Sequence, residues 1–180
     1  GPRLAIVPGA GGGPAYGLTR SEVSIANFNE FCTATASCSP KPISDEDFAN
    51  APITGISVAQ ANAYAAWLSK ASGGYVYRLP TDAEWLHAAK GGGGFKQADN
   101  SNCVPPGSQP GSGSPVSAKG KDANPWGLVH MSGNVWEWVS SGGKLMVRGA
   151  SFNDYWSDCT IEAKRDDDGQ PKKDVGFRVL

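Results

Sequence analysis

Apolar positions recur with helical spacing in two segments of the first half of the chain. Ser24 stands before the first segment as an N-cap, and Ile56–Ser57 leads into the second, which Gly73 and Gly74 terminate. The apolar face of the first predicted helix consists of Ile25, Phe28, Phe31 and Cys32. That of the second consists of Val58, Ala61, Ala65 and Leu68. Both segments are therefore predicted to be amphipathic helices packed on a core.

A third helix is predicted from its N-terminal signal. Thr81-Asp82-Ala83-Glu84 forms a capping box, in which the Thr81 and Glu84 side chains each accept a hydrogen bond from the other's backbone N–H. Trp85 follows on the buried face, and Gly91–Gly94 ends the segment.

Short apolar runs bounded by glycine and proline predict strands. These runs are Leu4–Pro8, Tyr16–Val23, Tyr75–Leu79, Leu145–Gly149, Thr160–Arg165 and Gly176–Leu180. The first two flank Gly9–Pro14 and are expected to pair as a hairpin. Residues 95–124 are polar, rich in glycine, serine and proline, and without periodicity, so a long irregular connection is expected there.

Composition agrees with a domain of many turns. The chain of 180 residues has 24 glycines and 13 prolines, which argues against a helical bundle. Its formal net charge of −1 gives no electrostatic reason to expect nucleic acid as a partner. No apolar run reaches the roughly 20 residues of a membrane helix. Gly1-Pro2 is typical of a protease scar, so we expect residues 3–180 to form a single domain excised from a larger protein.

The four cysteines, Cys32, Cys38, Cys103 and Cys159, allow three disulfide pairings. Cys32 and Cys38 are close enough in sequence to close a local loop, which would leave Cys103 to pair with Cys159. Free buried thiols are an alternative, and zinc is a weaker one because the chain has no Cys-x-x-Cys motif. If the bridges form, the compartment is oxidising, which means periplasmic, cell-surface or extracellular.

Three segments resemble the formylglycine-generating-enzyme family, also called sulfatase-modifying factors, whose members have a C-type-lectin-like fold. They are Arg78–Trp85, Gly127–Trp138 with its Gly-Asn-Val-Trp-Glu-Trp ending, and Arg148–Phe152 followed by Gly176–Arg178. The resemblance implies an α+β domain with short antiparallel strands, two or three helices and long irregular loops. We expect Arg148 and Arg178 to pair with buried carboxylates such as Glu84 or Glu137.

The resemblance also implies a copper(I) site made by two cysteines that oxidises a substrate cysteine. In this chain Asp154 occupies the first of these positions and Cys159 the second. A carboxylate is a hard ligand and replaces a soft thiolate poorly, so copper and oxidase activity are not expected. No other catalytic group is predicted, since His87 and His130 each stand without a nucleophile at motif spacing.

Calcium is the metal that the resemblance leaves open. The family binds it partly through the backbone of the Gly-Asn-x-Trp-Glu turn, here Gly133, Val135 and Glu137. His130 stands where the family usually offers an oxygen ligand, so one ligand is missing. Asp166, Asp167 and Asp168 form a rival acidic site or a solvated turn.

The segment Asn153–Asp158 is polar and aromatic, a composition typical of recognition surfaces, although Trp156 could instead pack inward. Its residues are Asn153, Asp154, Tyr155, Trp156, Ser157 and Asp158. With Asp166–Asp168 they resemble the diversified segment of retroelement variable proteins, and the sensor modules attached to bacterial Ser/Thr kinases are a second precedent. We therefore expect a non-catalytic module that binds a protein or small-molecule ligand. A copper-dependent oxidase and a purely structural domain remain the alternatives.

Overall fold

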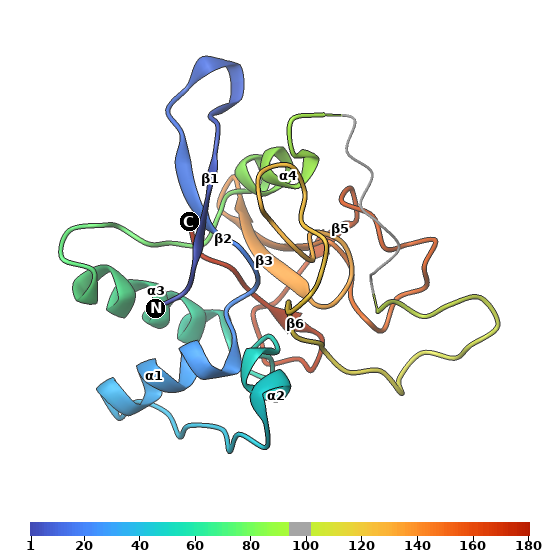
Figure 1. Cartoon of the computed structure of the whole chain (residues 1–180), viewed down its shortest axis with the longest axis horizontal. Coiled ribbons are helices and arrows are strands. Elements are labelled where there is room, and N and C mark those ends of the chain that lie inside the picture. Colours follow the sequence, from blue (N-terminus) through green and yellow to red (C-terminus); the bar gives the residue numbers. More distant parts are fainter. Residues whose placement is uncertain (94–101) are drawn as a thin grey trace.

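A computed structural model of the chain describes residues 1–93 and 102–180 (Figure 1). Part of the long connection expected over residues 95–124 therefore lies outside the described residues. Three helices gather on one side of the view, and the connections near residues 102–125 and 150–165 lie on the other. None of the helices described has the length and apolar character needed to cross a membrane.

The helices begin where the capping residues stand. Ser24, Asp45, Ser57 and Thr81 each accept a hydrogen bond from the backbone of the first turn that follows. The helices are α1 (Ile25–Thr35), α2 (Glu46–Asn50), α3 (Val58–Ala71) and α4 (Asp82–Lys90). Helix α2 is too short to show an apolar period and was not predicted.

The strands form two sheets. Strands β1 (Leu4–Val7) and β2 (Tyr16–Thr19) are an antiparallel hairpin, as predicted, with the one-turn helix η1 (Ala10–Gly12) in its loop. The second sheet has the order β5-β4-β3-β6. Its strands are β3 (Trp136–Ser141), β4 (Lys144–Arg148), β5 (Lys164–Asp166) and β6 (Val175–Gly176), and β6 runs parallel to β3.

Four strand predictions were wrong or too long, and in the hairpin the one over Tyr16–Val23 ends at Thr19, the last residue of β2. Tyr75–Leu79 forms no strand. Arg78 exchanges two backbone hydrogen bonds with Leu180, but Tyr75 and Val76 at the start of the segment are 73% and 80% exposed. The strand predicted over Thr160–Arg165 is confined to β5, because residues 160–163 form a tight turn. Of the strand predicted over Gly176–Leu180, only Gly176 belongs to a strand, which is β6.

Two apolar clusters lie on either side of the four-stranded sheet. In the larger cluster, Phe28, Phe31 and Tyr64 join α1 to α3 with ring centroids 5.3 to 5.9 Å apart. In the smaller one, Trp85 of α4 packs with the hairpin residues Val7 and Leu18. Trp136 and Trp138 both belong to the larger cluster, yet Glu137 between them is also buried, so β3 is covered on both faces.

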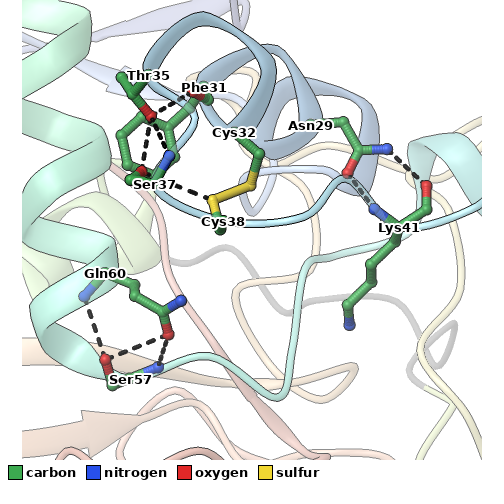
Figure 2. The surroundings of a disulfide bond; sticks show 9 residues. All are labelled: Asn29, Phe31, Cys32, Thr35, Ser37, Cys38, Lys41, Ser57 and Gln60. Carbon is green, nitrogen blue, oxygen red and sulfur yellow. Dashed lines mark hydrogen bonds between the residues drawn. A yellow bond between two sulfur atoms is a disulfide. The ribbon is translucent and has the colours of Figure 1, made fainter.

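Both disulfides expected from the cysteine spacing are present. The Cys32–Cys38 bridge closes the turn after α1, as Figure 2 shows. Beside it, Asn29 donates to the Lys41 carbonyl and accepts from the Lys41 N–H, both at 2.8 Å, which holds the following loop against the helix (Figure 2). Within the described residues no cysteine is free. Two bridges are consistent with an oxidising compartment.

A buried ion pair connects the C-terminal segment of the chain to β3. Arg178 donates to both carboxylate oxygens of Glu137, at 2.6 and 2.7 Å, and Trp85 Nε1 donates to the same carboxylate at 2.6 Å. Arg178 Nη1 donates to the carbonyl of Thr19, and Nη2, which also donates to Glu137, reaches the carbonyl of Val129. Arg178 thus pairs with one of the carboxylates expected. Arg148 does not: its partner is Asp82, because Glu84 is taken by Arg78.

Replacing Arg178 by methionine is expected to lower the free energy of unfolding by about 3–5 kcal/mol, because the Glu137 charge would stay buried without its partner. Urea denaturation measures the loss. Arg165→Met, on the exposed edge strand β5, is the control and should change stability by less than about 1 kcal/mol. Equal losses in the two variants would contradict the central role of the pair.

The N-terminus of α4 should make stability depend on pH. The Arg78 guanidinium and the Thr81 N–H lower the pKa of Glu84 from 4.5 to about 2, although partial burial opposes the shift. A lowered pKa in the folded state stabilises the protein above pH 4.5, and this contribution disappears as the pH falls toward 2. Glu84→Gln should therefore cost about 1 kcal/mol at pH 7 and almost nothing near pH 2, as followed by denaturation at both pH values. A difference that does not vary with pH would contradict the assignment.

Candidate functional site

The loop after Phe152 is held at both ends of its turn. The Asp154 carboxylate accepts from the N–H and the hydroxyl of Ser151, both at 2.8 Å, and the Asn153 N–H donates to Ser151 Oγ. On the far side, Val104 donates to the Asp154 carbonyl at 2.8 Å and accepts from the Trp156 N–H at 3.0 Å. The backbone of the loop is therefore fixed through its whole length.

The second disulfide adds a covalent link to this arrangement. Cys159, directly after the loop, is bonded to Cys103, whose neighbour Val104 makes the backbone bridge to Tyr155. A bridge between positions 56 residues apart restricts the unfolded chain and holds two irregular segments together. The loop can thus present side chains without support from a helix or strand.

The predicted loop residues divide into inward and outward groups. Asn153 and Asp154 are half-buried, and Asp154 is occupied as a turn cap. Tyr155 and Trp156 are 41% and 45% exposed, so Trp156 does not pack inward. Ser157 and Asp158 are exposed beside them. The outward surface therefore consists of two adjacent aromatic rings and two small polar groups.

The acidic residues 166–168 form a separate surface. The Asp167 side chain is 2% exposed and accepts from Trp138 Nε1 at 3.0 Å and from the Gly169 N–H at 2.8 Å, so it is a structural group. Asp168 is paired with Lys172, and Asp166 is exposed on β5. Within the described residues no hydrogen bond or ion pair joins these residues to the loop Asn153–Asp158. We therefore leave Asp167 out of the candidate binding surface.

The cysteine pair of the copper site is not reproduced. Cys159 is in a disulfide and has no thiolate to offer, and the Asp154 carboxylate is bound to Ser151. Soft thiolate ligands are what copper(I) requires. The residues at these two positions do not fit that metal.

Calcium binding at the turn of Gly133, Val135 and Glu137 is also disfavoured, because the Glu137 carboxylate already has partners. Both Glu137 oxygens already accept hydrogen bonds from Arg178, and one also accepts from Trp85. The Gly133 N–H donates to the Gly149 carbonyl at 2.7 Å, which attaches this turn to the segment directly after β4. Glu137 therefore does not fit the role of a calcium ligand. Among the described residues no group of three His, Cys, Asp or Glu side chains is arranged to hold a metal ion.

Behind this turn lies a buried polar cluster for which the sequence gives no local signal. Asn134 Nδ2 donates to Glu22 Oε1 at 2.8 Å, and His130 Nδ1 lies 3.3 Å from Glu22 Oε2. Burial would raise the pKa of Glu22, but His130 and Arg178 together outweigh it and lower the pKa. Asn134 also accepts from the Val116 N–H at 2.9 Å. The cluster thus fastens the irregular connection near residue 116 to the core, and its role is structural.

The comparisons with known proteins agree with this geometry. A family model described as "Sulfatase-modifying factor enzyme 1-like domain" matches residues 13–180. Among curated proteins, the formylglycine-generating enzyme of Streptomyces coelicolor is 34% identical over 51% of this chain and 32% of its own length. The inactive Cα-formylglycine-generating enzyme 2 of Bos taurus is 34% identical over 57% of this chain and 39% of its own.

A third curated relative, the serine/threonine-protein kinase pkn1 of Chlamydia caviae, is 32% identical over 56% of this chain and 15% of its own length. The chain therefore spans less than two fifths of the curated relatives named here. Among solved structures, Treponema denticola variable protein 1 superposes with a TM-score of 0.67 at 21% identity, covering 92% of this chain and 84% of its own.

PvdO from Pseudomonas aeruginosa superposes with a TM-score of 0.70 at 19% identity, covering 99% of this chain and 90% of its own. These two structural likenesses show the fold. The family match covers most of the chain and includes every motif named above. This chain belongs to the sulfatase-modifying factor enzyme 1-like family and has its C-type-lectin-like fold.

Proposed function

We propose that this chain is a non-catalytic module that binds a protein or small-molecule ligand through the outward side of the loop Asn153–Asp158. The observation that carries the proposal is the exposure of the consecutive residues Tyr155 and Trp156 on a backbone held by a disulfide and by Val104. Aromatic side chains with two rotatable bonds give large contact areas at low entropic cost. A rigid loop reduces that cost further.

Two features of the chain argue against the rival copper-dependent oxidase. That reaction would need a Cys159 thiolate, and here Cys159 is bonded to Cys103. Its partner cysteine is replaced by Asp154, which serves the turn instead. The relative from Bos taurus is itself described as inactive, so loss of activity has precedent in the family.

Two biological settings fit such a module. One is a diversity-generating-retroelement variable protein, for which the Treponema variable protein is a structural precedent. The other is a sensor domain attached to a bacterial Ser/Thr kinase, as the match to a Chlamydia kinase suggests. In both settings the module would face the periplasm, the cell surface or the exterior. A template repeat beside a reverse transcriptase would support the first setting, and an upstream kinase domain the second.

The binding surface can be tested by substitution once glycan and peptide arrays, probed with the wild-type chain, have given a ligand. Tyr155→Ala and Trp156→Ala should each weaken its affinity about tenfold or more, because buried aromatic anchors dominate interfaces. Isothermal titration calorimetry measures the effect. Tyr75→Ala removes an even more exposed aromatic ring, 73% against 41% and 45%, from a different loop and is the control. If the loop variants bind as well as wild type, the loop is not the binding surface.

The absence of oxidase chemistry can be tested separately. Thiol titration of the unfolded, unreduced protein should detect no free thiol, since all four cysteines are bonded. After reduction the same reagent should detect four. A reactive Cys159 in the unreduced protein would instead support the copper-dependent oxidase.

A further inference from the structure

A polar groove lies on another part of the molecule, away from the loop Asn153–Asp158. It is bounded by the first residues of the chain, the start of α1, helix α2 and the turn near residue 120, and its volume is about 570 Å³. Small-ligand pockets have volumes of roughly 300–1,000 Å³. The lining residues that matter for its chemistry are Arg3, Arg20, Asn27, Glu46, Lys119 and Lys121.

The groove is strongly positive although the chain as a whole carries a net charge of −1. Four cationic side chains face a single carboxylate, Glu46, which is paired with Lys119 at 3.2 Å through two exposed groups. In the described part of the chain, no ion pair is formed by Arg3, Arg20 or Lys121. The groove therefore has three cationic groups that its own carboxylate does not neutralise.

The two arginines stand on a rigid base. The Arg20 N–H donates to the Arg3 carbonyl at 2.8 Å, which continues the pairing of β1 with β2. The Arg20 carbonyl accepts from the Val129 N–H at 2.9 Å and from the buried Arg178 at 3.3 Å. The guanidinium groups of Arg3 and Arg20 thus extend from neighbouring positions on a fixed backbone.

The opposite wall is also attached to the fold. Ser117 donates to Asp47 of α2 at 3.4 Å, and the Lys121 N–H closes a turn with the Ala118 carbonyl. On the α1 side, Asn27 Oδ1 accepts from the Ser24 hydroxyl at 3.1 Å, and the side-chain nitrogen Nδ2 of Asn27 makes no hydrogen bond within the described residues. It is therefore a neutral donor available beside the cationic groups.

We propose that this groove binds a small ligand that carries two or more linked oxyanion groups, of phosphate or carboxylate chemistry. Guanidinium groups match the paired oxygens of such anions and bind them with two parallel hydrogen bonds. Two arginines from the end of the hairpin and two lysines from the turn near residue 120 line the same groove, which suits a ligand with several charges better than a single monoanion. The groove shares no residue with the aromatic loop, so this site is independent of the binding function proposed above.

Pyrophosphate and citrate are suitable probes, with inorganic phosphate for comparison, measured by isothermal titration calorimetry at low ionic strength. Wild type should bind pyrophosphate or citrate saturably at one site, and more tightly than phosphate. Arg20→Gln should weaken binding about tenfold, the value of one charged hydrogen-bonded contact. Glu46→Gln should tighten it two- to threefold, because it removes the competing carboxylate and frees Lys119.

Lys144→Gln is the matched control, since it removes an exposed cation at the start of β4 outside the groove and should leave affinity unchanged. Thermal denaturation confirms that each variant is folded. A preference for pyrophosphate over citrate would assign phosphate chemistry, and the reverse would assign carboxylate chemistry. The proposal is overturned if neither probe binds saturably below about 10 mM, or if Lys144→Gln weakens binding as much as Arg20→Gln does.

Discussion

The fold depends on the buried contact between Arg178 and Glu137. Through hydrogen bonds alone, Arg178 connects the end of the chain to β3, to the end of β2 and to the segment at Val129, and Glu137 extends the connection to α4 through Trp85. Two charges removed from water are tolerated only when each has its partner and its remaining hydrogen bonds. This requirement ties elements that are distant in sequence to a single arrangement.

The surface loops can be irregular because this core is strongly constrained. The long connection near residue 116 is fastened by Asn134, and the loop after Phe152 by Ser151, Val104 and a disulfide. None of these attachments requires a helix or a strand. The scaffold can therefore keep its core while the side chains of one loop change.

Local signals in the sequence predicted local structure. The N-caps Ser24 and Thr81 placed two helix starts correctly, because an N-cap acts within its own first turn. Glu22 had no such signal, since its partners His130 and Asn134 lie 108 and 112 residues away. Tyr75–Leu79 was misread for a related reason: its apolar character suggested a strand, but no neighbouring strand reaches it. In the candidate site, composition indicated a recognition loop but left open whether Trp156 packs inward, and the inward turn of Asp167 depended on Trp138 from β3.

The turn at Ser151 and Asp154 has a consequence for how this loop tolerates sequence change. Asp154 is committed to Ser151, so replacing it would loosen the turn even though it lies in the middle of the loop. The four positions that follow it are exposed, and within the described residues no hydrogen bond ties their side chains to the rest of the fold. The positions that can change most freely are therefore Tyr155–Asp158, which lie between Asp154, held by Ser151, and Cys159, held by its disulfide. Such a boundary lets the outward side chains change with little effect on the stability of the domain.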